Sequence, residues 1–285
     1  MISRRTVLAA SLLAAPAAWA FRALADDFEG ALATLERRHG VRLGVAVLDT
    51  ANGRLRWHRG DERFPLCSTF KFLAAALVLA RVDRKEESLD RRIMYGKADL
   101  VTYSPITENY AGEGMTVGAL CEAAVTLSDN TAGNLLLDSF GGPAGLTAYM
   151  RSLGDDVTRL DRRETALNEA APGDPRDTTT PVAMAAALQK TVLGTALSPM
   201  SRTQLVDWLV ATKTGDKRLR AGVPKGWRVG NKTGSGGNNA TNDVGVFWPS
   251  DRAPIVVAAY YVGADAPDDQ RSAVLAEVGR LASST

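Results

Sequence analysis

The sequence predicts an α/β fold of the α+β kind, in which both chain ends form an antiparallel sheet flanked by helices. β-rich runs occur near the start and the end of the 285-residue chain, and helical patterns fill the middle. A hydrophobic content of 45% supplies a core for one large domain or two closely packed ones. We expect an α/β domain from residues 26–66 and 212–285, an inserted all-helical domain from residues 67–211, and a cleft at their junction.

The first 25 residues have the organisation of an export signal. Arg4 and Arg5 form a twin-arginine pair, an apolar stretch follows, and residues 18–20 and 23–25 each fit the A-x-A cleavage pattern. The alternative is an uncleaved membrane anchor, but the apolar run is shorter than the roughly 20 residues that a span needs, and it contains Pro16. We expect cleavage, export to the periplasm by the twin-arginine route, and no stable membrane anchor afterwards.

The start of the remaining chain predicts a helix and a β-hairpin. Apolar residues recur at helical spacing in residues 26–40, which end in a glycine, a usual helix stop. Residues 41–49 and 54–59 are β-rich, and the connecting TANG contains an Asn-Gly pair.

The middle of the chain is predicted to be helical and the tail to return to strands. Six segments have period-3.6 apolar faces: residues 71–82, 117–128, 131–140, 143–154, 181–193 and 199–212. Three β-rich runs follow, at residues 227–234, 242–248 and 255–263. Residues 268–282 close the chain with an amphipathic helix.

The charge of the exported chain argues against nucleic-acid binding. Without the three arginines of the first 25 residues, 34 − 3 = 31 basic residues face 32 acidic ones, a net charge of −1. No basic face is implied. His39 and His58 lack metal-ligand spacing to each other or to a cysteine, so we expect no metal and no cofactor. A nucleophile in this chain therefore needs a base other than histidine.

Ser68 and Lys71 stand three residues apart at the start of an apolar helical run. On a helix their side chains share one face, and Ser68 lies in the first turn, where free N–H groups favour a developing anion. A lysine in a partly apolar cleft has a lowered pKa and can accept the proton of a serine. The alternative is a capping serine beside a lysine that snorkels to the surface.

Three further motifs favour the catalytic interpretation. SDN at 128–130 falls at a helix break, KTGSG at 232–236 follows a β-rich run, and RRETALN at 162–168 stands in a stretch without clean periodicity. Taken singly, these motifs have structural explanations: a helix cap, a hairpin turn and a surface loop. In this order, however, S-x-x-K, S-D-N and K-T-G are the signature of class A β-lactamases and penicillin-binding proteins.

The sequence resembles the class A serine β-lactamases over essentially the whole chain after the export signal. GGPAGLTAYMRSLGD at 141–155, the loop from RRETALN to PGDPRD, and ATNDVGVFWP at 240–249 are also similar to that family. The resemblance implies a serine β-lactamase/penicillin-binding-protein-like fold and a monomer. It implies hydrolysis of small-molecule β-lactams, both penicillins and cephalosporins, and leaves carbapenems open.

The resemblance also implies the catalytic roles. Ser68 would be the acylated nucleophile, Lys71 its partner in proton transfer, and Ser128 the group that passes the proton to the β-lactam nitrogen. Glu164 and Asn168 would activate the water that hydrolyses the acyl-enzyme. Whether Lys71 or Glu164 takes the first proton is open.

The substrate-binding roles follow in the same way. Asn130 would bind the side-chain amide of the substrate. The carboxylate of the substrate would be held by Lys232, Thr233 and Ser235. The backbone N–H groups of Ser235 and of the nucleophile would form the oxyanion site.

Softer similarities concern the rim of the cleft. Tyr103 stands where the family has an aromatic wall, with core packing as the alternative. Arg218 resembles an arginine that reinforces carboxylate binding. Arg162 and Asp177 would form a salt bridge that holds the glutamate loop.

The two cysteines, Cys67 and Cys121, are expected to be free thiols. The resemblance places the bridging partner of Cys67 at Gly236 and that of Cys121 at Ala75, so neither disulfide found in other members can form.

Two alternatives share parts of this pattern. A penicillin-binding D,D-peptidase has the serine, lysine and KTG chemistry but lacks an efficient deacylating glutamate, so Glu164 with Asn168 argues against it. A non-catalytic β-lactam receptor stays acylated and is joined to a transmembrane segment, for which this chain has no candidate beyond its signal.

Overall fold

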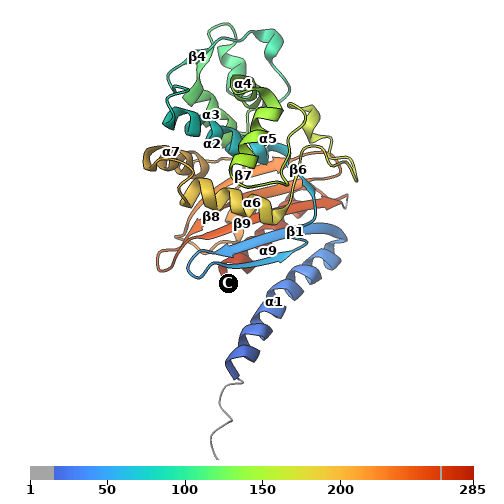
Figure 1. Cartoon of the computed structure of the whole chain (residues 1–285). Helices are drawn as coiled ribbons and strands as arrows, with labels where there is room; N and C mark the ends of the chain where they lie inside the picture. Colours follow the sequence, from blue (N-terminus) through green and yellow to red (C-terminus); the bar gives the residue numbers. More distant parts are fainter. Residues whose placement is uncertain (1–15, 264) are drawn as a thin grey trace, which may run out of the picture.

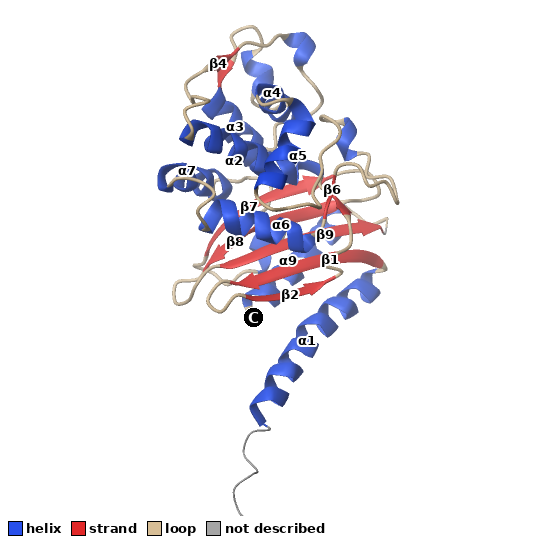
Figure 2. Ribbon diagram, viewed as in Figure 1, coloured by secondary structure: helices blue, strands red, loops and turns tan. Residues whose placement is uncertain are grey.

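A five-stranded antiparallel sheet with helices on both faces organises the molecule. The computed structural model describes residues 16–263 and 265–285. The strand order is β2-β1-β9-β8-β7. The helices of the middle of the chain stack on one side of the sheet, and α1 and α9, from the two chain ends, lie on the other (Figures 1 and 2). Both ends of the chain thus build the sheet, as the sequence predicts.

The elements from the chain ends follow the predicted pattern closely. They are α1 (Pro16–His39), β1 (Val41–Asp49), β2 (Arg54–His58), β7 (Arg228–Ser235), β8 (Thr241–Trp248), β9 (Ile255–Gly263) and α9 (Asp268–Ser283). The predicted hairpin is confirmed, because β1 and β2 pair antiparallel. The predicted start of the first helix at residue 26 is wrong, since α1 begins at Pro16; the preceding segment is rich in alanine, which favours helix. Residues 1–15 of the predicted export signal lie outside the described residues.

The six predicted middle helices are confirmed. They are α2 (Phe70–Asp83), α3 (Val117–Thr126), α4 (Asn130–Ser139), α5 (Gly142–Ser152), α6 (Pro181–Leu188) and α7 (Pro199–Val210). α6 continues into a π-helical turn, Gln189–Leu193. Thr116, Thr180 and Ser198 cap α3, α6 and α7 by accepting hydrogen bonds from backbone N–H groups.

Several short elements escaped the sequence patterns. They are β3 (Phe64–Pro65), β4 (Arg92–Ile93), β5 (Met115–Thr116), β6 (Thr178–Thr179) and α8 (Leu219–Gly222). Such elements are too short to show a hydrophobic period, so only tertiary pairing reveals them. β3 and β6 pair with each other, as do β4 and β5.

The sheet is buried on both faces, which explains the near-continuous apolar run of β9. Val256 and Ala258 belong to the core shared with the middle helices, and Val257 and Ala259 belong to the core shared with α1 and α9. This alternation is the period of two that a strand imposes. The division of the chain into two domains stays a prediction. Helix α6, which belongs to the inserted segment, packs on β1 and β9 of the sheet.

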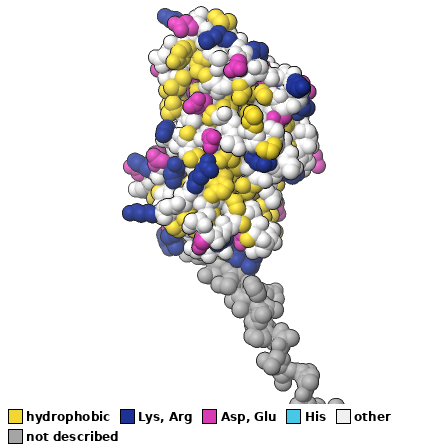
Figure 3. Space-filling model, turned by 90° about the vertical axis from the view of Figure 1, so that its left-hand side faces the viewer, with side chains coloured by type: hydrophobic (Ala, Val, Ile, Leu, Met, Phe, Trp, Pro, Cys, Tyr) yellow, Lys and Arg dark blue, Asp and Glu magenta, His cyan; other side chains and the backbone are white. Residues whose placement is uncertain are grey.

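The described part of the chain contains no helix with the length and apolar character needed to cross a bilayer. On the face drawn in Figure 3, basic and acidic side chains are interspersed among hydrophobic and neutral ones.

Candidate active site

Ser68 and Lys71 meet at the entrance of α2. Ser68 lies in a short 3-10 helix, Cys67–Thr69, and Lys71 in the first turn of α2 that follows it. Lys71 Nζ donates a hydrogen bond to Ser68 Oγ at 2.9 Å. Gly133 on α4 makes room for the lysine, because a Cβ there would lie 2.9 Å from Lys71 Cε. The three-residue spacing thus produces the contact that the sequence predicts.

Glu164 completes this cluster from the opposite side. Its Oε1 lies 2.9 Å from Lys71 Nζ and accepts a hydrogen bond from Ser68 Oγ at 3.1 Å. Asn134 on α4 holds the glutamate backbone twice: its Oδ1 accepts from Glu164 N and its Nδ2 donates to Glu164 O, both at 2.9 Å. The backbone that carries the Glu164 carboxylate is therefore held by α4.

The Lys71 ammonium is completely buried, and burial lowers its pKa although the nearby Glu164 carboxylate raises it. Lys71 Nζ also donates to Ser128 O at 2.8 Å and to Asn130 Oδ1 at 2.6 Å. A lysine with a lowered pKa gives up its proton more readily than an exposed lysine does.

The SDN segment has one structural residue between two that face the site. Ser128 has a φ of 60°, and its Oγ accepts a hydrogen bond from Lys232 Nζ at 3.0 Å. Asp129 caps α4 and also accepts hydrogen bonds from Ile106 N and Thr107 N. Helix capping, the structural explanation of this motif, therefore applies to Asp129 alone.

The KTGSG segment forms the end of β7. Lys232 is fully buried, and burial together with the nearby Lys71 charge holds its pKa well below the usual range. Thr233 Oγ1 shares a 2.6 Å hydrogen bond with Thr214 Oγ1. Arg218 NH2 donates to Ser235 Oγ at 2.8 Å, so the arginine indeed stands beside the strand.

These residues surround a cavity of about 400 Å³. It is lined by Ser68, Tyr103, Ser128, Asn130, Asn168, Thr214, Arg218, Thr233, Gly234, Ser235 and Asp268. Lys71, Glu164 and Lys232 are buried directly behind this lining. A larger cavity of about 530 Å³ is lined by α6, by the loop that follows α5 and by Asp61 and Arg63, and it shares no residue with the first cavity, so its size does not make it the site.

Tyr103 is at the rim of the cavity and is 55% exposed, so the core-packing alternative is wrong. Its φ of 63° is unusual for a tyrosine.

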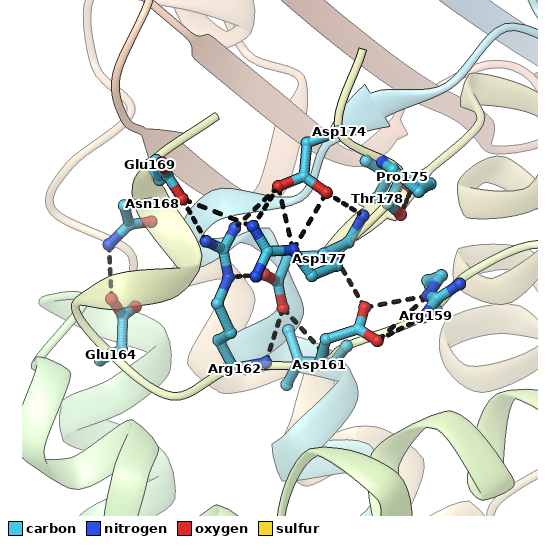
Figure 4. Close-up of polar contacts among 12 residues, drawn as sticks. Arg159, Asp161, Arg162, Glu164, Asn168, Glu169, Asp174, Pro175, Asp177 and Thr178 are labelled. Atoms are coloured by element: carbon cyan, nitrogen blue, oxygen red, sulfur yellow. Dashed lines mark hydrogen bonds and ion pairs between the residues drawn. The ribbon is translucent and has the colours of Figure 1, made fainter. Parts of the chain in front are cut away.

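The loop that carries Glu164 and Asn168 is held by ion pairs (Figure 4). Arg162 Nε donates to Asp177 Oδ2 at 2.5 Å, and Asp177 Oδ1 accepts from the backbone N–H groups of Asp161 and Arg162. The predicted Arg162–Asp177 pair is confirmed, and its side chains are only 17% and 1% exposed. At the other end of the loop, Asn168 Nδ2 donates to Glu164 Oε2.

Both cysteines are free and buried, as predicted, and burial raises the pKa of the Cys67 thiol to about 12. Within the described residues, no three His, Cys, Asp or Glu side chains are grouped so as to hold a metal ion.

Three residues at the site were not predicted from the sequence: Asn134, Thr214 and Asp268. Asn134 could have been found, because it follows Asn130 by four residues on one helix and so shares its face. Thr214 and Asp268 stand in segments without a motif, and only the tertiary fold brings them to the cavity.

Comparisons with known proteins agree with the fold and the site. The sequence model of the β-lactamase enzyme family matches residues 27–285. β-Lactamase L2 of Stenotrophomonas maltophilia is 52% identical over 259 residues, covering 90% of this chain and 84% of that protein. The carbapenem-hydrolyzing β-lactamase KPC of Klebsiella oxytoca is 49% identical over 280 residues, covering 98% and 96%. The solved structure of an ancestral class A β-lactamase (GNCA) is 68% identical, with a TM-score of 0.88, covering 89% of this chain and 98% of that chain.

The protein is therefore a hydrolase that acts on β-lactams. The chain belongs to the β-lactamase enzyme family, as a class A serine β-lactamase. Nothing in the comparisons supports a D,D-peptidase or a receptor.

Proposed function

We propose that the enzyme opens the β-lactam ring by two-step acyl transfer, with Ser68 as the nucleophile. The observation that carries this proposal is the position of Ser68 Oγ, 2.9 Å from Lys71 Nζ and 3.1 Å from Glu164 Oε1. Both groups are within reach of the hydroxyl proton. An oxygen that loses its proton here attacks the ring carbonyl and becomes acylated.

Ser128 completes the proton transfer in this proposal. Its backbone carbonyl accepts from Lys71, and its hydroxyl accepts from Lys232. The hydroxyl thus lies beside Lys232 Nζ and would deliver its proton to the ring nitrogen as the amide bond breaks. A protonated Lys232 beside it would also stabilise the negative charge that develops on the departing nitrogen until that proton arrives.

Substrate binding is assigned to the opposite wall of the cavity. Lys232, Thr233 and Ser235 would hold the substrate carboxylate, with Arg218 behind Ser235 adding a second buried positive charge. Asn130 would bind the side-chain amide, and Tyr103 would provide the aromatic wall. The oxyanion would lie between the N–H groups of Ser68 and Ser235, where losing one donor typically costs about 10²- to 10³-fold in rate.

Glu164 and Asn168 would activate the water that releases the product. Asn168 donates one hydrogen bond to Glu164, and its Oδ1 is buried with no partner among the described residues. A buried acceptor without a donor is costly, and a water held between the amide and the carboxylate would supply that donor. The same water would be aligned to attack the acyl carbonyl.

The test is a pair of variants treated with a penicillin. Glu164→Gln keeps the shape of the side chain but not the base, so it should accumulate a covalent adduct on Ser68 that intact-mass spectrometry detects. Ser68→Ala should show no adduct. Rapid turnover by Glu164→Gln would contradict the role of the glutamate, and titration of the unaltered enzyme by one equivalent of penicillin would contradict hydrolysis itself.

We propose that penicillins and cephalosporins are both substrates, because Ser235 and the glycines after KTG resemble members active on both. The relative KPC is named for carbapenem hydrolysis. By resemblance, members that hydrolyse carbapenems also have a cysteine at the position of Cys67. Their second cysteine, which pairs with it, is replaced by Gly236 in this chain. Steady-state kinetics on one penicillin, one oxyimino-cephalosporin and one carbapenem measure the range directly.

We also propose that the chain is exported through the twin-arginine route, cleaved after residue 20 or 25, and active as a periplasmic monomer. The support is the sequence of the first 25 residues. Replacing Arg4 and Arg5 by lysine should retain the precursor in the cytoplasm, and the intact mass of exported protein fixes the cleavage site.

A further inference from the structure

Asp268 brings a carboxylate to the mouth of the active-site cavity. It is the one acidic residue among the cavity-lining residues that the structure describes. Its side chain is 57% exposed, and its Oδ1 lies 3.8 Å from Arg218 NH2 and accepts a hydrogen bond from Arg271 NH2 at 3.2 Å. A negative charge therefore stands beside the arginine that supports the carboxylate subsite.

The second carboxylate oxygen of Asp268 retains capacity to accept hydrogen bonds. Among the described residues, the contact recorded for Oδ2 is the Ser272 hydroxyl at 3.5 Å, which is long for a hydrogen bond. A carboxylate oxygen can accept about two such bonds. A charged group of a bound ligand could thus pair with Asp268 without displacing either arginine.

We propose that Asp268 is a specificity-determining residue that favours β-lactams with a positively charged substituent next to their carboxylate. The inference rests on the proposed function, which puts the substrate carboxylate against Ser235 and Arg218. In a cephalosporin, the C3 substituent is attached to the ring carbon beside the one that bears the carboxylate. With the carboxylate against Ser235 and Arg218, that substituent would lie on the neighbouring ring atom, and Asp268 Oδ1 at the start of α9 is 3.8 Å from Arg218 NH2.

A purely structural role for Asp268 is distinguishable from this one. Asp268 and Asp269 both lie in the first turn of α9, where acidic side chains interact favourably with the helix dipole. Asp269 pairs with the exposed Lys217 and does not line the cavity. A helix-stabilising effect would be shared by both residues, whereas the effect on substrate choice belongs to Asp268 alone.

The experiment compares two cephalosporins that differ in the charge at C3, one with a pyridinium-methyl and one with an acetoxymethyl group. We expect Asp268→Asn to lower the ratio of kcat/KM for the cationic over the neutral compound by about 3- to 10-fold, the range of a partly screened charge pair. The matched control, Asp269→Asn, should leave the ratio unchanged. Raising the salt concentration should reduce the preference of the unaltered enzyme and leave that of Asp268→Asn nearly constant.

Binding to Ser68→Ala gives the same comparison without turnover, as a ratio of dissociation constants with and without Asp268→Asn. An unchanged ratio in both measurements, or an equal change with Asp269→Asn, would overturn the role of Asp268. Failure of Glu164→Gln to accumulate an adduct on Ser68 would overturn the proposed function instead, so the two failures are separable. A general movement of Arg218 would alter both compounds together and cancel in the ratio.

Discussion

Gly236, just after β7, lies so close to Asn168 and to Cys67 that there is no room for a side chain. A Cβ at this position would lie 2.7 Å from Asn168 O and 2.7 Å from Cys67 Sγ. The next residue, Gly237, donates a backbone hydrogen bond to Asn168 O at 2.8 Å. The residues just after β7 therefore fit directly against the loop that carries the proposed deacylating pair.

Gly236→Ala should displace Asn168, because the added Cβ would lie 2.7 Å from its backbone oxygen. A backbone atom cannot turn aside as the tip of a flexible side chain can, so the loop itself has to shift. We expect kcat for a penicillin to fall about 10- to 100-fold and the free energy of unfolding to fall by about 1–3 kcal/mol. Steady-state kinetics and urea unfolding measure the two effects. Gly30→Ala on α1, where a Cβ would meet nothing within 4 Å, is the control that should retain full activity. A Gly236→Ala enzyme with unchanged kcat would mean that Asn168 is not held by this contact.

Residues of the site could be predicted where the sequence holds them in local motifs. Ser68 and Lys71 share one helical turn and Lys232 and Ser235 share one strand, so local spacing sets the position within each pair, whereas their roles in the site came from the resemblance to the family. Asp268 reaches the cavity because α9 starts beside Arg218, and no local spacing contains that information.

At the scale of elements, ion pairs within the loop from Arg162 to Asp177 hold the segment that carries Glu164. Arg162 pairs with Asp177 and also with Glu169 and Asp174 (Figure 4). Asp177 is nearly fully buried, so its charge depends for stabilisation on the Arg162 guanidinium and on the backbone N–H groups of Asp161 and Arg162.

Asp177→Asn should loosen this loop, since one partner of a mostly buried ion pair is lost. We expect the free energy of unfolding to fall by about 2–4 kcal/mol, and kcat to fall at least about tenfold as Glu164 loses its alignment. The matched control is Asp138→Asn, which breaks the exposed pair with Arg163, worth about 0–1 kcal/mol. Equal losses in the two variants, measured by urea unfolding and penicillin kinetics, would show that burial of the first pair is unimportant.

Long elements were predictable and short ones were not. α2 to α7 have enough turns to show a period of 3.6, whereas β3 to β6 are pairs of residues whose strand character comes from a distant partner. The predicted start of α1 was wrong because a cleavable signal and a helix share the same alanine-rich composition.

At the scale of the whole molecule, Glu36 attaches α1 to the sheet. It accepts hydrogen bonds from Leu43 N at 3.0 Å and from both ends of the Arg59 guanidinium fork, at 2.7 and 2.8 Å. Burial alone would raise its pKa, but the hydrogen bonds from Arg59, Leu43 and His58 lower the pKa to about 2.

Glu36→Gln should therefore destabilise the protein in a pH-dependent way. A carboxyl whose pKa is lowered on folding contributes its stability above the unfolded value of about 4.5 and loses it as the pH falls toward 2. We expect a loss on the order of 2 kcal/mol at pH 7 that shrinks between pH 5 and pH 2. Urea unfolding across this range measures it, with the exposed Glu29→Gln as the control. A pH-independent difference between the Glu36 variant and the unaltered protein would contradict the linkage.

The strand order of the sheet sets when the molecule can be completed. β1 lies between β2 and β9, and Asp49 pairs with Ile255, so residues near the two ends of the sequence are neighbours in the sheet. A ribosome must synthesise nearly the entire chain before β1 finds its second partner, and closing so long a loop slows folding. Any prematurely terminated product would expose an open strand edge and would be prone to aggregate.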